Sequence, residues 1–207
     1  MFGFNSEEAR LFKKLNTPEK IQDFLNRLPF NFEKGGDTLM SPRRVLSEKK
    51  AHCFEGALFA ATGLWAGGGR PLIMDLLTTN DDDYHVVALF KKYGSWGAIS
   101  KTNHAVLRYR EPIYKNLHEL SLSYFHEYFL NKNGKKTLRE YSRPLDLSLK
   151  RFSGWTVSAD NLWPIDKALE ETKHYRLLSP LQIKKLRPAE AIERRAGRIV
   201  EWKPKGR

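Results

Sequence analysis

The sequence predicts an α+β fold in a single domain, because helical patterns surround one compact group of strand patterns. The chain has 207 residues, of which 41% are hydrophobic and 12% aromatic, so it is long enough and apolar enough to bury its own core. Helical spacing of apolar residues occurs toward both ends, and three short strand patterns lie together between residues 71 and 102. Such segregation of helices and strands is typical of α+β proteins.

Four helices are expected before the strands. Ser6, Thr17 and Ser41 each stand where an N-cap residue is expected, since their side-chain oxygens can accept from free N–H groups of the first turn. The fourth helix has the clearest pattern: its apolar side chains recur on one face, and it ends at the three glycines that begin with Gly67. The four expected helices cover residues 6–15, 17–28, 41–49 and 51–66.

Three strands are expected next. Residues 71–77 form an apolar run typical of a buried strand, and a polar turn follows it. Residues 85–92 and 96–102 flank a tight turn at Gly94 and are expected to pair as an antiparallel hairpin. Alternation places His85 on the same face as Val87 and Leu89.

The C-terminal half is expected to be mainly helical. Helices are predicted over about residues 117–129, over a segment capped by Asp160 or Asn161 that runs to about 173, and over residues 188–195. Residues 144–155 fit either a strand or an extended loop.

The domain prediction is one α+β domain over residues 1–183, followed by a basic C-terminal segment over residues 184–207. That segment has nine basic and three acidic residues, which is half of the net charge of +12. A basic segment of this kind can attract nucleic acid or an acidic partner.

The cysteine content and the N-terminus favour a cytoplasmic location. A single cysteine rules out an internal disulfide and suits a reducing compartment. The N-terminus shows no secretory pattern, and the most apolar stretch, residues 57–66, is too short to span a bilayer. The oligomeric state is not indicated by the sequence.

Cys53 is the first candidate catalytic residue, because it falls in the first turn of the fourth helix. The positive end of the helix dipole and the basic neighbours Lys49, Lys50 and His52 favour the thiolate, which is the nucleophilic form. The backbone N–H of Cys53 would also lie where an oxyanion needs a donor. The alternative is a buried cysteine with a purely structural role.

His85 is the second candidate, since a histidine on an otherwise apolar strand face is either a satisfied core residue or a catalytic base. The following strand brings Ser100 and Asn103 to the level of His85 or beyond it. Either side chain could hold the imidazole in one tautomer, as the third member of a triad does. The alternative for Asn103 is that it only caps the end of the strand.

Four stretches resemble the transglutaminase-like superfamily, a branch of the papain-like cysteine enzymes. They are similar to its cysteine helix, the break and strand that follow, the strand that begins with its histidine, and the strand that usually ends in an aspartate. In this chain the four stretches read CFEGALFAA (53–61), GRPLIM (69–74), HVVALF (85–90) and GSWGAIS (94–100). The resemblance covers about residues 41–104.

The resemblance implies a papain/transglutaminase-like core in which a cysteine helix precedes a small antiparallel sheet, with extra N- and C-terminal helices. It implies a hydrolase or acyltransferase that acts on a peptide or a small amide or thioester through an acyl-thioester on Cys53. His85 would be the general base and then the acid, with no metal or other cofactor.

The sequence departs from the family pattern at the third member of the triad, where Ser100 or Asn103 stands in place of aspartate. The alternative function is therefore a catalytically inactive transglutaminase-like protein that uses its basic surface to bind nucleic acid or an acidic partner. The sequence names neither the substrate nor a second oxyanion donor.

Overall fold

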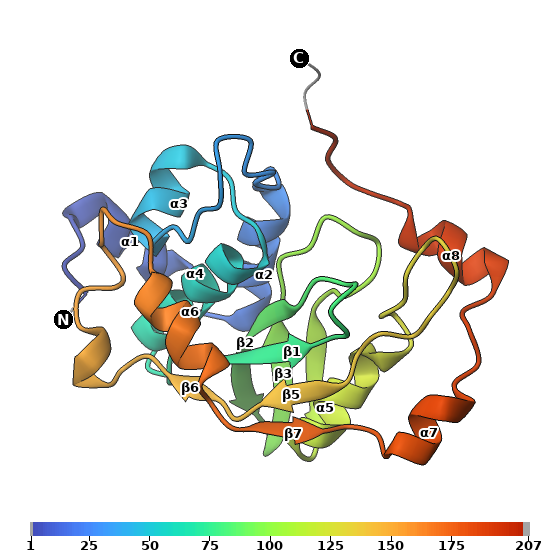
Figure 1. The fold of residues 1–207 in the computed structure, drawn as a ribbon. Helices are drawn as coiled ribbons and strands as arrows, with labels where there is room; N and C mark the ends of the chain where they lie inside the picture. The colour runs from blue at the N-terminus through green and yellow to red at the C-terminus, as the bar shows by residue number, and fades with distance from the viewer. Residues whose placement is uncertain (1, 205–207) are drawn as a thin grey trace.

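The chain folds as an α+β protein in a computed structural model that describes residues 2–204 (Figure 1). Within that range it contains eight α-helices, one 3-10 helix and one antiparallel sheet of seven strands. The α-helices are α1 (Ser6–Lys14), α2 (Pro18–Arg27), α3 (Pro42–Glu48), α4 (Cys53–Ala66), α5 (Leu117–Phe125), α6 (Trp163–Glu170), α7 (Pro180–Lys185) and α8 (Ala191–Gly197), and the 3-10 helix is η1 (Lys150–Phe152). The strands are β1 (Leu72–Leu77), β2 (His85–Lys92), β3 (Ser95–Ile99), β4 (Arg110–Tyr114), β5 (Glu140–Ser142), β6 (Leu145–Asp146) and β7 (His174–Arg176).

Helix α4 lies at the centre of the molecule. Helices α1, α2 and α3 pack against it, and its other side contacts β1 and β2 (Figure 1). The sequence predicted one buried face, but every residue from Phe54 to Gly63 is buried. The many small side chains of this helix explain the difference, because they let neighbouring elements approach it from all sides.

The sheet runs in the order β4-β3-β2-β1-β5-β7, and β6 pairs with β1 beside β5. The predicted hairpin is present: β2 and β3 pair from Ala88 opposite Ile99 to Lys92 opposite Ser95. Tyr93 and Gly94 connect these strands with φ of 54° and 79°, as expected for a two-residue turn with both residues in the left-handed region. The third strand ends at Ile99, three residues earlier than predicted.

The two faces of the sheet carry separate apolar clusters, as the alternation in β2 predicted. Val86, Ala88 and Phe90 belong to the cluster shared with α4, while Val87 and Leu89 belong to the cluster shared with α5. The sheet is thus covered by helices on both faces.

Several predicted boundaries were wrong. Asn5 caps α1 instead of Ser6, because its carboxamide oxygen accepts from Glu7 N and Glu8 N. Helix α5 ends at Phe125, and α6 begins at Trp163 after a bend, so neither Asp160 nor Asn161 is its cap.

Strands β4, β5 and β7 and helix α7 were not predicted. Strands β5 and β7 have three residues each, which is too few for alternation to be recognised, and none of the five residues of β4 is buried. In the segment left open between strand and loop, residues 144–155, the structure has β6 followed by η1.

The C-terminal part of the chain follows the surface of the domain (Figure 1). Residues 199–201 run beside residues 103–105, where Ala105 N donates to Ile199 O and Glu201 N donates to Asn103 O. Lys205 and Arg207, which contribute to the predicted basic segment, lie outside the described residues. Within residues 2–204, no helix combines the length and the apolar character that crossing a membrane requires.

Candidate active site

Cys53 is the first residue of α4, at the end of the helix that faces the sheet edge where β2 begins. His52 is the N-cap residue and has an extended backbone conformation. N–H groups of the first helical turn have no partner within the helix, and the helix dipole places partial positive charge there. The half-buried thiol of Cys53 therefore lies in a field that favours its anion.

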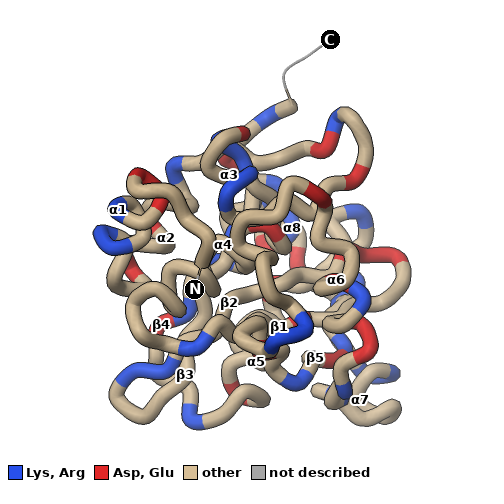
Figure 2. The backbone as a smooth tube through the Cα atoms, turned by 90° about the vertical axis from the view of Figure 1, so that its left-hand side faces the viewer, with Lys and Arg blue, Asp and Glu red and all other residues tan. Residues whose placement is uncertain are grey.

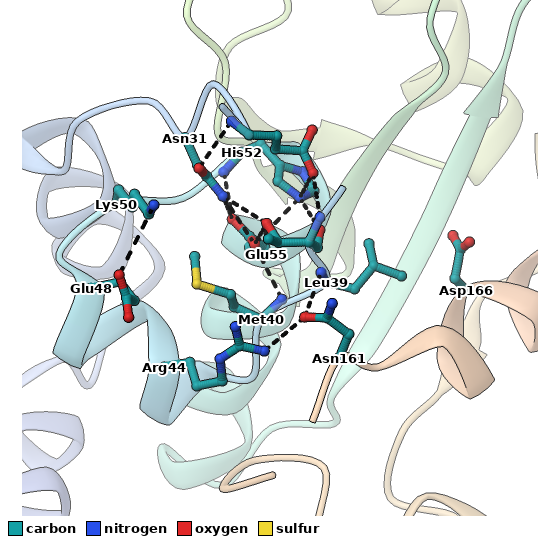
Figure 3. A network of polar contacts seen from close by, with 12 residues as sticks. Asn31, Leu39, Met40, Arg44, Glu48, Lys50, His52, Glu55, Asn161 and Asp166 are labelled. Carbon is teal, nitrogen blue, oxygen red and sulfur yellow. Dashed lines mark hydrogen bonds and ion pairs between the residues drawn. The ribbon is translucent and has the colours of Figure 1, made fainter. Parts of the chain in front are cut away.

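A fully buried carboxylate fixes the backbone beside Cys53. Glu55 accepts hydrogen bonds from Asn31 Nδ2 (3.1 Å), Thr38 Oγ1 (2.8 Å), Met40 N (3.2 Å) and His52 N (3.0 Å). Figure 3 shows Asn31, Met40 and His52 converging on Glu55. Because these donors satisfy the buried charge, the carboxylate can hold the start of α4 and the loop before it in one arrangement.

The ring of His52 is also held in place. Its Nε2 lies 2.8 Å from Thr38 O and 3.5 Å from an oxygen of Glu55. A carbonyl oxygen only accepts hydrogen bonds, so Nε2 of His52 carries a proton.

His85 begins β2, and its side chain is joined to Ser100 just beyond the end of β3. The Nε2 atom of His85 lies 2.7 Å from Ser100 Oγ, and Ser100 Oγ donates to Leu107 O at 2.5 Å. Because the hydroxyl proton is committed to the carbonyl, Ser100 accepts from His85 and Nε2 carries the proton. Nδ1 is then the nitrogen of His85 that can exchange a proton with a reacting group.

Helix α2 holds Ser100 from the other side. Gln22 Nε2 donates to Ser100 O at 2.8 Å, and Ser100 N donates to Gln22 Oε1 at 3.0 Å. The serine is thus fixed through both backbone groups as well as through its hydroxyl.

Asn103, the other predicted partner of His85, is engaged elsewhere. Its Nδ2 donates to Trp202 O at 3.0 Å, and its Oδ1 accepts from Trp202 N at 2.8 Å. The structure therefore brings His85 and Ser100 together and directs the Asn103 side chain to the C-terminal segment.

A buried carboxylate on β1 is also paired away from His85. Asp75 lies 3.6 Å from His174 Nε2 on β7, and its backbone N–H donates to Ser142 Oγ. Burial raises the pKa of Asp75, while the His174 and His85 imidazoles oppose that rise. Asp75 lies opposite Val86 in the pairing of β1 with β2, and the hydrogen-bond partner of His85 Nε2 is Ser100.

Two imidazoles set the electrostatics of the thiol. Burial on its own would raise the pKa of Cys53, but the hydrogen bonds and positive charges of His52 and His85 lower it to about 6. For His52, burial on its own would lower the pKa, but the hydrogen bond with Cys53 and the negative charges of Cys53 and Glu55 raise it to about 9. At neutral pH the pair is a thiolate beside an imidazolium.

Cys53 and His85 line one cavity of about 220 Å³. Its wall includes the loop before β2, the segment after β3, the segment that follows α5 and Gly197. Ser100 does not line the cavity and contacts the imidazole of His85 from outside it, which fits a residue that orients the imidazole.

Close approach of α4 to the wall of this cavity depends on Gly56. A Cβ atom at this position would lie 2.3 Å from Lys101 Cβ, so a larger residue would push the helix away from the segment that holds Ser100. Lys101 is itself buried and donates to Leu25 O and Leu28 O at the end of α2.

Sequence reasoning located Cys53, His85 and Ser100 but missed the residues that support them. It treated His52 only as a nearby charge and gave no role to Glu55, although the spacing from His52 to Glu55 is that of a capping box. Gln22 and Ser100 are separated by 78 positions in the sequence, and no local sequence pattern predicts a contact between residues so far apart.

Comparison with known proteins does not identify this site. No protein-family model matches the chain, and no curated protein matches its sequence significantly.

Proposed function

We propose that the chain is a cysteine-dependent hydrolase or acyltransferase of transglutaminase-like type, acting on an amide, peptide or thioester through an acyl-thioester on Cys53. The observation that carries the proposal is that Cys53 and His85 line one cavity while His85 Nε2 is hydrogen-bonded to Ser100 Oγ at 2.7 Å. The lowered pKa of Cys53, about 6, supports it. A nucleophilic cysteine needs a thiolate near neutral pH and an adjacent group that can move protons.

In the proposed reaction, the active form has Cys53 as the thiolate and a proton on Nδ1 of His85. The thiolate attacks the substrate carbonyl carbon, a C–S bond forms, and the carbonyl π electrons move to oxygen. When the tetrahedral intermediate collapses, the carbon–nitrogen or carbon–sulfur bond breaks and the leaving group takes the proton from His85 Nδ1. The product bound to Cys53 is an acyl-thioester.

In the second half, water or an amine attacks the acyl carbon and gives a proton to Nδ1 of His85, and the C–S bond then breaks so that Cys53 leaves as the thiolate and the starting state is restored. His52 has a different role in this scheme, because its Nε2 proton is bound by Thr38 O and its pKa is about 9. It supplies a constant positive charge beside the sulfur, while His85 transfers protons.

The order of elements supports the transglutaminase-like part of the proposal. The chain has a cysteine at the start of a central helix, a histidine at the start of a strand and a polar residue after the next strand. This is the order that the sequence resemblance implies. Ser100 replaces an aspartate with a neutral acceptor, so it fixes the tautomer of His85 but adds no negative charge. A free catalytic thiol suits a reducing compartment, and we therefore propose that the protein acts in the cytoplasm.

Capture of the acyl-enzyme tests the proposal. The protein is incubated with p-nitrophenyl acetate near pH 7, and intact mass with peptide mapping then locates the acetyl group. We expect an adduct on Cys53 in the unaltered chain, a much slower reaction in His85→Ala and none in Cys53→Ala. Failure of the unaltered, folded chain to acylate at Cys53 would rule out the nucleophile.

We favour this function over binding of nucleic acid or an acidic partner through residues 184–207. The Lys and Arg positions are scattered over several elements, with acidic positions between them (Figure 2). Within the basic segment, Arg187 pairs with Glu190, and Arg194 and Arg198 donate to backbone carbonyls of residues 132 and 131. Retention on a heparin column that is lost when residues 184–207 are removed would instead support the binding function.

A further inference from the structure

A second cavity lies beside the cavity of Cys53 and His85. It has a volume of about 610 Å³ and is lined by residues 29–36, Thr38, Lys50, Trp202 and Lys203. Phe30 lines both cavities, so they share part of a wall. Asn103 also joins them, because it lines the first cavity and is hydrogen-bonded to Trp202 of the second. The two cavities are therefore neighbours.

The second cavity also reaches the imidazole that precedes Cys53. Two residues of its wall contact the His52 ring: Thr38 O lies 2.8 Å from His52 Nε2, and Glu33 Oε1 lies 3.5 Å from the same atom. His85, in contrast, lines the first cavity. The second cavity is therefore on the His52 side of the candidate site.

The proposed reaction needs separate places for the two parts of its substrate. The leaving group takes a proton from His85 Nδ1, and the attacking water or amine must then occupy the same place to give a proton back. The acyl group stays bonded to Cys53 through both steps, so it has to leave the space at His85 open. The cavity on the His52 side offers that place.

Three half-buried aromatic residues form the apolar part of the second cavity, namely Phe30, Phe32 and Trp202. The rings of Phe30 and Phe32 pack edge to face, with their centroids 5.3 Å apart. Backbone pairing holds this part of the wall, because Asn31 N donates to Ala51 O at 3.2 Å. Aromatic walls of this kind bind apolar groups, since both surfaces are removed from water.

Lysines give the same cavity a positive charge. Three of them line it, Lys34, Lys50 and Lys203. Within the described part of the chain, Glu33 is the one acidic residue of the wall. Its Oε1 atom accepts from Thr38 N at 2.7 Å and lies beside the His52 imidazole, whose positive charge it balances. An anionic group in the cavity would therefore be attracted by the lysines.

We propose that the second cavity binds the acyl group of the substrate, and that this acyl group has an apolar body and a carboxylate. The inference rests on the proposed acyl transfer and names the class of acyl group that Cys53 would carry. The apolar body would pack on the aromatic residues, and the carboxylate would lie beside the lysines.

Esters that share one leaving group test the proposal. The folded chain is acylated with p-nitrophenyl acetate, p-nitrophenyl octanoate and mono-p-nitrophenyl suberate, and each rate is divided by that of the same ester with a small free thiol. In every case the C–S bond to Cys53 forms and the bond to p-nitrophenolate breaks, so only the acyl group differs. We expect the octanoate to react roughly tenfold faster than the acetate. The suberate, which adds a terminal carboxylate, should react roughly threefold faster than the octanoate at low salt.

Two variants separate the apolar and the charged parts of the cavity. Phe32→Ala should remove most of the advantage of the octanoate over the acetate. Lys203→Gln replaces an exposed side chain and should lower the preference for the suberate over the octanoate to less than about twofold. We expect both variants to react with p-nitrophenyl acetate and with iodoacetamide at unaltered rates, because neither residue touches the thiol cavity.

Lys184→Gln is the matched control for Lys203→Gln. Lys184 is exposed on α7 and lines neither cavity, so the preference for the suberate should be retained in full.

An octanoate ester that reacts no faster than the acetate would overturn the proposal, as would a suberate ester that reacts no faster than the octanoate. A preference for the suberate that Lys203→Gln leaves intact would also overturn it, because the carboxylate would then be bound elsewhere. None of these outcomes touches the proposed function, which fails only if p-nitrophenyl acetate does not acylate Cys53 in the unaltered chain.

Discussion

Cys53 owes its predicted reactivity to two histidines that reach it by different routes. His52 is adjacent in the chain and is held by Thr38 O, while His85 comes from β2 and is held by Ser100. Each imidazole favours the thiolate, so the pKa of Cys53 falls to about 6 although burial opposes this. In the proposed mechanism, His52 stabilises the negative charge of the thiolate and His85 transfers protons.

Replacement of Ser100 tests the orientation of His85. Ser100→Ala removes the acceptor for Nε2–H, so the imidazole can rotate or adopt the other tautomer. We expect acylation of Cys53 to slow by roughly 10-fold or more, which is part of the 10²–10⁴-fold that a positioned base contributes. The measurement is the rate of p-nitrophenol release.

Ser121→Ala is a suitable control, because Ser121 is also buried and donates to a backbone carbonyl, Leu117 O, but belongs to α5 and does not line the cavity. Unaltered acylation in Ser100→Ala would show that Ser100 does not orient the base.

At the scale of elements, the site is the meeting point of α4, the start of β2 and the segment after β3. The sequence was enough to predict α4 and the hairpin of β2 and β3, since both have long, regular apolar patterns. It could not choose between Ser100 and Asn103, because the choice depends on β3 ending at Ile99 and on the path of the chain beyond it. That path is fixed by Gln22 from a distant helix.

Gly56 is the element-scale test of this arrangement. Alanine normally stabilises a helix interior relative to glycine by up to about 1 kcal/mol. At Gly56 we expect the opposite sign, a loss of about 1–3 kcal/mol in the free energy of unfolding, because the new Cβ would overlap Lys101. Urea denaturation measures the change.

Gly35→Ala is the control for that substitution, since nothing lies within 4 Å of a Cβ at Gly35. A Gly56→Ala protein as stable as the unaltered chain would mean that α4 and the segment at Lys101 are further apart than described.

At the scale of the whole molecule, the C-terminal segment closes back onto the domain beside the candidate site. Asn103 binds both backbone groups of Trp202, and Gly197 lines the same cavity as Cys53. Charge counts predicted a basic appendage, but composition alone cannot reveal contacts that depend on the register between residues 103–105 and 199–201.

Limited proteolysis tests the attachment of this segment. Asn103→Ala removes two hydrogen bonds, so local opening of residues 197–202 should become easier by about 1–2 kcal/mol. We expect trypsin to cut at Arg198 several-fold faster, as followed by intact mass. Asn133→Ala, in an exposed turn, should leave that rate unaltered. Equal cleavage rates in all three proteins would contradict the described pairing.

The pH dependence of Cys53 alkylation tests the central claim most directly. Because Cys53 is the only cysteine, iodoacetamide incorporation into the folded chain reports this thiol alone. Only the thiolate reacts, and its pKa is lowered, so the rate should rise with pH through a midpoint of about 6 and be near its plateau at pH 7. His52→Ala and His85→Ala should each move the midpoint upward. A midpoint near the ordinary thiol value of about 8.5, or a native protein whose Cys53 does not react, would contradict the proposal that Cys53 is a nucleophile.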